Sequence, residues 1–146
     1  DGPSPHVDLG HEKKVGDFVR GLIADGLATA VHDCSSGGIA LAVAEMAMAS
    51  GIGAHLNQLN DHDPIPVFYG EDQGRYVITV KESNLTKVQE RAEAAGIFCP
   101  WIGRTGGSWV TLGSARPVSI EQLRSAHESW FPDFMEGGSG TVAAAE

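Results

Sequence analysis

A pair of adjacent glycines, Gly37 and Gly38, stands between two apolar segments and constrains the fold more than any other feature. The short segment 28–31 before the pair predicts a buried strand. The run 39–49 after it has Glu45 as its only polar residue, and a helix that is apolar almost all round is buried. We therefore expect a strand, a tight turn and a central helix. The core-facing residues of this helix are expected to be Ala40, Val43, Ala44 and Ala47.

The turn before this helix has the features of an anion site, although packing alone explains it equally well. Ser35 and Ser36 are good helix N-caps, and Gly37 and Gly38 let a ligand approach the backbone closely. The first N–H groups of a helix are unpaired and its dipole is positive there. Ser35, Ser36, Gly37 and Gly38 are therefore candidate nucleotide- or phosphate-binding residues. In the alternative, the two glycines only allow a tight turn.

A second polar cluster, Glu71, Asp72, Gln73 and Arg75, interrupts an extended region and is flanked by glycines. Such glycines allow a bulge or a close backbone approach, and carboxylate and amide side chains suit a ribose, an amide substrate or a cation-bridged phosphate. These four residues are therefore candidates for a substrate-like or auxiliary site. A surface turn, in which Arg75 pairs with Glu71 or Asp72 at little gain in stability, explains the same residues.

No catalytic residue and no metal ligand is assigned from the sequence. His32 and Asp33 are neighbours on the predicted strand, so they face opposite sides and form no dyad; we expect His32 to be buried and hydrogen-bonded. Cys34 is either a thiol of lowered pKa near a helix N-terminus or a structural cysteine. It and Cys99 lack the spacing of a metal site or a disulfide framework, and we interpret both as reduced.

The apolar helix leaves one acidic residue to explain. Glu45 needs a partner in these surroundings, and Arg75 and Arg20 are the candidates.

Length and charge limit the class of protein. The 146 residues are enough for one compact domain. The net charge of -9 argues against a general nucleic-acid surface or an anionic-membrane surface, and no apolar run is long enough for a membrane span. We expect a linker remnant at 1–6, a single α+β domain at 7–136 and a flexible tail at 137–146. The linker-like start suggests a domain cut from a longer protein.

Apolar periodicity and turn residues predict the remaining elements. The further strands expected are 53–56, 67–69, 75–81, 98–102 and 109–112. The last two are expected to form a hairpin around 103–108, and 75–81 to be central in its sheet because both its faces are apolar. The further helices expected are 9–25 with Asp8 as its cap, 85–95, and one that starts at a capping box of Ser119 and Gln122. This order predicts an α+β fold, a mixed β-sheet covered by α-helices.

Two of these helices have a face that we expect to be buried. In the first helix these residues are Val15, Phe18, Val19, Leu22 and Ile23. In the last helix they are Ile120, Leu123, Ala126 and Trp130.

Four segments together resemble a known family. They are VHDCSSGGIALAVAEMAMASGIGAHL, VFYGEDQGRYVITV, IGRTGG and LRSAHESWFPDFM, in that order. They closely resemble the C-terminal end of the large subunit of phosphoribosylformylglycinamidine synthases, in the aminoimidazole ribonucleotide synthetase-related superfamily. The resemblance covers about 7–135. The family commonly has Asp at the position of Ser36. The serine makes the turn of this chain less acidic than the family pattern.

The resemblance implies an ATP-dependent carbon–nitrogen ligase of purine biosynthesis. The intact enzyme converts formylglycinamide ribonucleotide, ATP and glutamine-derived ammonia to formylglycinamidine ribonucleotide, ADP and phosphate. It uses ATP/ADP and magnesium, whereas the fragment alone is expected to require no cofactor and to be inactive. The implied partners are the remaining domains of the large subunit, a glutaminase subunit and a small bridging subunit, in the cytoplasm, with no nucleic acid and no membrane.

The family also suggests a role for the candidate site and leaves alternatives. This chain resembles the second of two related α+β domains, whose site is thought to hold a structural nucleotide without turnover. One alternative is a domain of a sister ATP-using synthetase, such as aminoimidazole ribonucleotide synthetase or selenophosphate synthetase. Another is a non-catalytic interaction module.

Overall fold

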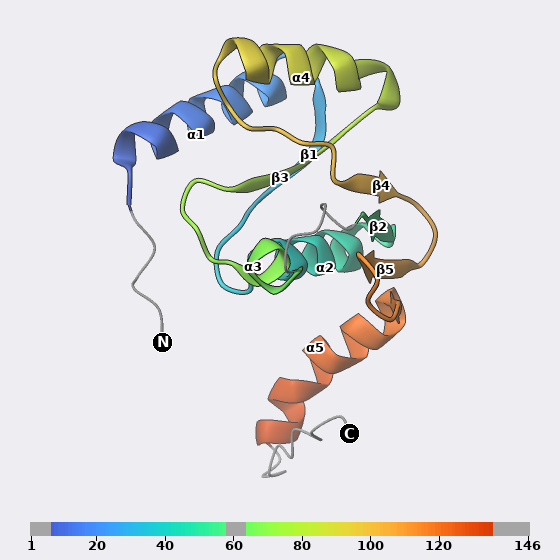
Figure 1. Cartoon of the computed structure of the whole chain (residues 1–146). Coiled ribbons are helices and arrows are strands. Elements are labelled where there is room, and N and C mark those ends of the chain that lie inside the picture. The colour runs from blue at the N-terminus through green and yellow to red at the C-terminus, as the bar shows by residue number, and fades with distance from the viewer. Residues whose placement is uncertain (1–6, 58–63, 136–146) are drawn as a thin grey trace.

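The computed structural model describes residues 7–57 and 64–135, so the predicted linker remnant 1–6 and tail 137–146 lie outside the described residues. Helices and short strands alternate along the chain (Figure 1). The helices are α1 (Leu9–Ala24), α2 (Gly38–Ser50), α3 (Pro64–Tyr69), α4 (Leu85–Ala94) and α5 (Ile120–Met135), with a 3-10 turn at Glu82–Asn84. The strands are β1 (Ala28–Asp33), β2 (Ala54–Leu56), β3 (Tyr76–Val80), β4 (Gly103–Thr105), β5 (Trp109–Leu112) and β6 (Val118–Ser119).

The described strands form two sheets, one of which is mixed. β1 and β3 pair antiparallel and make a two-stranded sheet. The other sheet has the order β4-β2-β5-β6, in which β2 runs parallel to β5 and the other neighbours are antiparallel. Helices lie around both sheets (Figure 1), so the predicted α+β fold with a mixed sheet is confirmed.

Hydrophobic cores lie on both faces of the β1–β3 pair. Val77 of β3 belongs to the core around α2. Ile78 and Val80, which alternate with it along the strand, pack against the core formed by Leu22 of α1 and Val88 of α4. β3 is therefore apolar on both faces although β1 is its only neighbour among the described strands. The expectation that this strand is central in its sheet is wrong.

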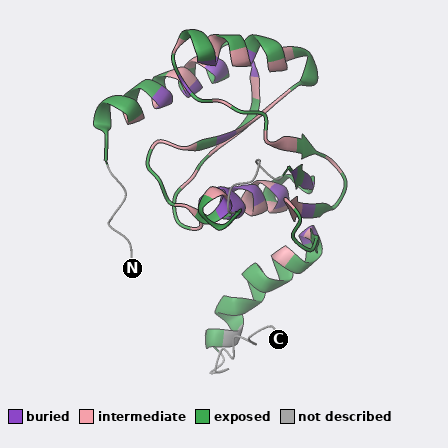
Figure 2. Cartoon of the chain, in the orientation of Figure 1, coloured by how far each residue is buried: buried purple, intermediate pink, exposed green. Residues whose placement is uncertain are grey.

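Helix α2 lies at the centre of its core, as the sequence predicts (Figure 2). Ala40, Val43 and Ala47 are buried, as expected, and so is Ala42. Ala44 is only half-buried, so its assignment to the core is wrong. Small side chains on this face let the helix approach its neighbours closely.

α2 begins at a left-handed glycine rather than at a serine cap. Gly37 is the N-cap with φ +75°, and no side chain of its own caps the helix. Gly38 has φ +59°, and a Cβ there would lie 2.5 Å from the carbonyl oxygen of Gly70. The glycines therefore let the helix start pack against the end of α3. The expectation that Ser35 or Ser36 is the N-cap is wrong.

The starts of α1 and α5 are capped as their sequences predict. The Asp8 carboxylate accepts a hydrogen bond from the His11 N–H at 3.0 Å. In the capping box before α5, the Ser119 N–H donates to Oε1 of Gln122 at 3.0 Å, and the Gln122 N–H donates to Oγ of Ser119 at 3.1 Å. These local patterns satisfy backbone donors that the helix itself leaves unpaired.

Two expected helix faces are only partly buried. On α1, Val15, Val19 and Leu22 are buried, as expected, whereas Phe18 is only half-buried and Ile23 is exposed. On α5, Ile120 is buried and Leu123 half-buried, whereas Ala126 and Trp130 are exposed. The inward positions predicted for Ile23, Ala126 and Trp130 are wrong because no other described element covers them.

Prolines explain why two segments that the sequence predicts as strands are not strands. The segment 67–69 is the end of helix α3, which begins at Pro64, a residue well suited to the first turn of a helix. The segment 98–102 forms no regular element, since Pro100 has no N–H to donate and Phe98 is exposed. Both strand predictions are wrong, and the next strand, β4, starts only at Gly103.

The predicted hairpin of 98–102 and 109–112 is also wrong. β4 and β5 do not pair, because β2 lies between them. The loop that joins them passes over the start of β2, where the Gly53 N–H donates to the Gly107 carbonyl at 2.9 Å and the Gly106 N–H donates to the Gly53 carbonyl at 2.8 Å. A Cβ at Gly53 would lie 2.3 Å from the carbonyl oxygen of Trp109, so this crossing leaves no room for a side chain.

Candidate functional site

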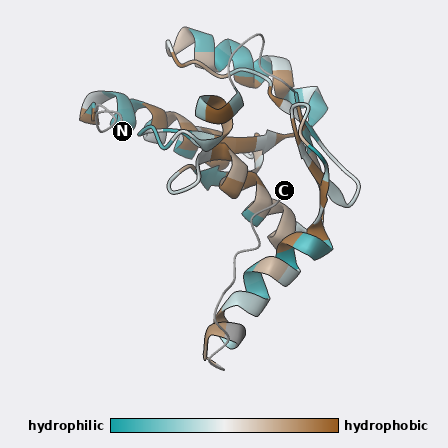
Figure 3. Ribbon diagram, turned by 60° about the horizontal axis from the view of Figure 1, so that its bottom comes forward, coloured by the Kyte–Doolittle hydropathy of each residue, from teal (hydrophilic) through white to brown (hydrophobic). Residues whose placement is uncertain are grey.

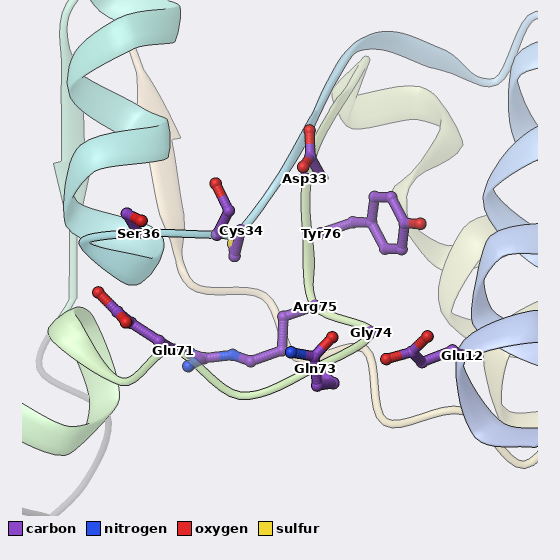
Figure 4. Close-up of a pocket in the computed structure, with 10 residues that line it drawn as sticks. Glu12, Asp33, Cys34, Ser36, Glu71, Gln73, Gly74, Arg75 and Tyr76 are labelled. Atoms are coloured by element: carbon purple, nitrogen blue, oxygen red, sulfur yellow. The ribbon is translucent and has the colours of Figure 1, made fainter. Parts of the chain in front are cut away.

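A pocket of about 420 Å³ lies between α1, the turn before α2 and the loop before β3 (Figure 4). Its volume is within the range of small-ligand sites. Its lining combines residues from three separate parts of the chain: Glu12, Asp33, Cys34, Ser35, Ser36, Glu71, Gln73, Gly74, Arg75 and Tyr76. The turn of the first candidate site and the loop of the second therefore meet in one pocket.

Glu71 joins the two candidate sites directly. Its Oε1 accepts a hydrogen bond from the Gly37 N–H at 2.8 Å, and Figure 4 shows its side chain beside Ser36 at the start of α2. A carboxylate in this position is favoured by the helix dipole. The Gly37 N–H, which would otherwise face an external anion, is therefore already hydrogen-bonded to the Glu71 carboxylate. The Gly38 N–H is also engaged, by the Ser35 carbonyl at 3.1 Å.

Arg75 holds the loop that carries Glu71. Its Nη1 donates to the Gly70 carbonyl at 2.9 Å and its Nη2 to the Val67 carbonyl at 2.9 Å, so the guanidinium caps the end of α3. Nη1 also lies 3.3 Å from Oδ2 of Asp72. The Arg75 carbonyl in turn accepts from the Cys34 N–H at 2.8 Å. Arg75 therefore ties the loop to the turn before α2, which a simple surface ion pair would not do.

The pocket brings together most of the predicted site residues. Ser35, Ser36, Glu71, Gln73 and Arg75 all line it. The others lie beside it. The Gly37 N–H is bonded to the lining residue Glu71, Gly38 packs on the backbone at the end of α3, and the Asp72 side chain is mostly exposed next to Arg75.

Sequence reasoning missed Glu12, Asp33 and Tyr76 as pocket residues. Glu12 reaches the pocket from α1, and its Oε1 is buried without a hydrogen-bond partner among the described residues. Glu12 looks like an ordinary exposed acid of the first helical turn, so the sequence carries no signal for it. With Asp33 and Glu71, it makes three carboxylates in the lining of the pocket, where Arg75 is the one cationic residue that the structure describes. This excess of negative over positive charge in the lining disfavours a bare anion and suits a cation or a cation-bridged ligand.

The cysteines are free, as expected, and neither is an activated thiol. Burial raises the pKa of the Cys34 thiol, Arg75 opposes this rise and Asp33 adds to it. The alternative of a lowered pKa for Cys34 is therefore wrong. Burial also raises the pKa of the Cys99 thiol. Both thiols are thus protonated structural groups at neutral pH.

Glu45 and His32 form a pair outside this pocket. His32 Nε2 lies 3.1 Å from Oε2 of Glu45, and His32 Nδ1 lies 2.7 Å from the Asp33 carbonyl oxygen. The partner of Glu45 is therefore His32, and the expectation of Arg75 or Arg20 is wrong. His32 is hydrogen-bonded as expected, but it is half-buried rather than buried.

Within residues 7–57 and 64–135, no group of three or more His, Cys, Asp or Glu side chains is arranged to hold a metal ion. In the same part of the chain, no helix combines the length and the apolar character needed to cross a bilayer.

Comparison with known proteins identifies close relatives. The family model of "AIR synthase related protein, C-terminal domain" matches residues 1–112. The chain is 72% identical over 137 residues to the phosphoribosylformylglycinamidine synthase subunit PurL of Rhizobium meliloti, covering 94% of this chain and 18% of that protein. It is 66% identical over 146 residues to the PurL subunit of Agrobacterium fabrum, covering 100% of this chain and 19% of that protein. The chain thus spans about a fifth of the length of the curated relatives that it matches.

Solved structures show the same fold at low sequence identity. The structure of PurLQS from Thermotoga maritima aligns with a TM-score of 0.71 at 18% identity, over 82% of this chain and 23% of that chain. T. maritima PurL complexed with FGAR aligns with a TM-score of 0.70 at 18% identity, over 80% of this chain and 21% of that chain.

Proposed function

Because the chain belongs to the family of AIR synthase related protein C-terminal domains, we propose that it is one domain of the large subunit of a phosphoribosylformylglycinamidine synthase. The resemblance inferred from the sequence is confirmed by the family match and by the relatives at 66–72% identity. The observation that carries the proposal is this identity over nearly the whole chain. The sister synthetases are not favoured, since the curated relatives reported above carry the name of this synthase.

The proposed whole enzyme converts formylglycinamide ribonucleotide, ATP and ammonia to formylglycinamidine ribonucleotide, ADP and phosphate. Its partners would be the other domains of the subunit, a glutaminase subunit and a small bridging subunit. T. maritima PurL has been solved complexed with FGAR, with ATP and with ADP, and within PurLQS. These structures support nucleotide and substrate binding by the whole subunit. The two free cysteines suit a reducing compartment, and we place the subunit in the cytoplasm.

Within this enzyme, we assign the chain a binding role rather than a catalytic one. The pocket supplies hydroxyls from Ser35 and Ser36, an amide from Gln73 and a guanidinium from Arg75, which suit a ribose or a phosphate group. The carboxylate of Glu71 would repel a bare phosphate at the Gly37 N–H. A phosphorylated ligand therefore fits here together with a cation such as magnesium. Phosphate oxygens would supply part of the coordination of this cation, because the described carboxylates do not form a metal site of their own.

A chimeric subunit tests the proposed function. This chain is placed in the Agrobacterium fabrum relative instead of its own matching segment, to which it is 66% identical. With ammonia, ATP and formylglycinamide ribonucleotide, the chimera is expected to release ADP at a rate within roughly tenfold of the unaltered relative. The isolated chain should release none, because it spans only about a fifth of the length of that subunit. A folded but inactive chimera, or an active isolated chain, would contradict the proposal.

The binding role of the helix start is tested separately by NMR on the isolated chain. Inorganic phosphate is expected to leave the Gly37 amide unshifted while Glu71 occupies it. In Glu71→Ala, phosphate should shift the amides of Ser36, Gly37 and Gly38, with weak affinity of roughly millimolar Kd.

Asp72→Ala is the matched control for this titration. It also removes one carboxylate, but one that lies beside Arg75 rather than on the Gly37 N–H. It should behave like the unaltered chain. If the three amides stay still in Glu71→Ala while other amides move, the glycines serve packing alone.

A further inference from the structure

Helix α5 carries an apolar stripe that is buried at its start and exposed along the rest of its length. At about 100° per residue, its large apolar side chains fall on one face; they are Ile120, Leu123, Trp130, Phe131, Phe134 and Met135. Ile120 and Leu123 pack into the core around α2. Ser125 and Ser129 lie on the opposite side of the helix, whereas Arg124 and His127 fall on the apolar face between Leu123 and Trp130. The same face therefore continues from the core into solvent.

The distal half of α5 projects away from the rest of the fold (Figures 1 and 3). Trp130 is 62% exposed, Phe131 60%, Phe134 62% and Met135 67%. The rings of Trp130 and Phe134 stack on each other with centroids 5.5 Å apart, so they form a continuous apolar patch. Each such aromatic ring buries roughly 150–250 Å² when it is covered. Contiguous exposed patches of this size mark interaction sites.

An unsupported helix gains little stability from its own backbone. Most helix stability in proteins comes from packing of an apolar face. Beyond the contact of Arg124 with the Met48 carbonyl, the described side chains of the distal half are exposed. A covering partner would therefore stabilise this half as well as bury its aromatic rings.

The comparisons indicate where the partner lies. The family model ends at residue 112, before α5 begins, so α5 lies outside the part of the chain that the family model matches. The alignment with the A. fabrum subunit, however, extends over 146 residues of this chain, and four-fifths of that subunit lies outside it. α5 thus belongs to what this chain shares with long subunits rather than with the domain family as a whole.

We propose that the stripe of Trp130, Phe131, Phe134 and Met135 docks into an apolar groove in the rest of the same large-subunit polypeptide. This inference rests on the proposed function, which places the chain within a longer subunit. The mode is that of an amphipathic helix in a groove, with anchors at i, i+1, i+4 and i+5 on one face. The stripe then joins the core around α2 to its neighbouring domain.

Thiol labelling of the chimeric subunit tests this docking. Phe134→Cys places a thiol on the stripe, and Ser129→Cys places one on the polar side of the same helix as a matched control. A maleimide reagent is applied to the chimera and to the isolated chain, and labelled peptides are quantified by mass spectrometry. At position 134, labelling is expected to be roughly tenfold slower in the chimera than in the isolated chain, and at position 129 about equal in both.

Hydrogen exchange keeps the test valid if Phe134→Cys itself weakens docking. In the unsubstituted chimera, amides 125–135 should exchange more slowly than in the isolated chain. Equal labelling at position 134 together with equal exchange would overturn the inference. Protection that already occurs in the isolated chain, rises with its concentration and coincides with a dimer in light scattering would assign the stripe to a second copy and would overturn it as well.

The two proposals fail in different ways. An inactive chimera that still protects position 134 would refute the proposed function and support the docking. An active chimera in which position 134 is as reactive as in the isolated chain would refute the docking alone.

Discussion

Gly38→Ala is expected to destabilise the chain by about 2–5 kcal/mol. Gly38 has φ +59°, which L-residues adopt only at a cost. An added Cβ would also lie 2.5 Å from the Gly70 carbonyl oxygen and 2.8 Å from that of Phe68. Arg75 donates hydrogen bonds to the Gly70 and Val67 carbonyls, so this stretch of backbone cannot move aside cheaply. Urea unfolding, followed by tryptophan fluorescence, measures the loss.

Gly26→Ala is the control that separates backbone strain from the steric clash. Gly26 has φ +65°, similar to that of Gly38, but nothing lies within 4 Å of the position of its Cβ. Gly26→Ala should lower the free energy of unfolding by about 1–2 kcal/mol, from the backbone conformation alone. Equal losses for the two variants would show that α2 and the end of α3 are not in close contact.

Leu22→Ala should cost about 2–5 kcal/mol. Leu22 has 0% exposure and packs with Leu27 and Val88 where α1, β1 and α4 meet. Shortening it leaves a cavity that three elements line, and they cannot collapse together without losing other contacts. The same urea unfolding assay measures this loss.

The neighbouring residue is the matched control. Ile23 is 53% exposed, so Ile23→Ala should change stability by no more than about 0.5 kcal/mol. Similar losses for the two variants would contradict the described position of α1, because the helix would then have a different buried face.

Features that depend on neighbours in sequence follow from the sequence alone. Asp8 caps α1, Ser119 and Gln122 form a capping box, and Gly51 ends α2, because in each case the interacting groups lie within four residues. The central place of α2 in its core also follows, because the run 39–49 has Glu45 as its only polar residue, although Leu41 of this helix is 41% exposed. The α+β fold was predictable from such local patterns, and the family from the resemblance of four segments to known members.

Residue pairs that are distant in sequence were decided by the tertiary structure. Glu71 bonds the Gly37 N–H across 34 positions, and Glu45 bonds His32 from another element. Glu12 enters the pocket from α1, although nothing near it in sequence marks it as a ligand-site residue. The sequence predicts the turn at 35–38 and the cluster around Glu71 as two separate candidate sites. It does not predict that the Glu71 carboxylate accepts the hydrogen bond of the Gly37 N–H.

Strand order and burial depended on the tertiary structure as well. β2 separates β4 from β5, although these two strands are close in sequence and look like a hairpin. β3 is apolar on both faces because a core lies on each side, not because strands flank it. Ile23 and Trp130 follow the same apolar spacing as their buried neighbours, yet they are exposed. Apolar periodicity determines which face of an element avoids water, whereas the elements that pack against it determine how much of that face is covered.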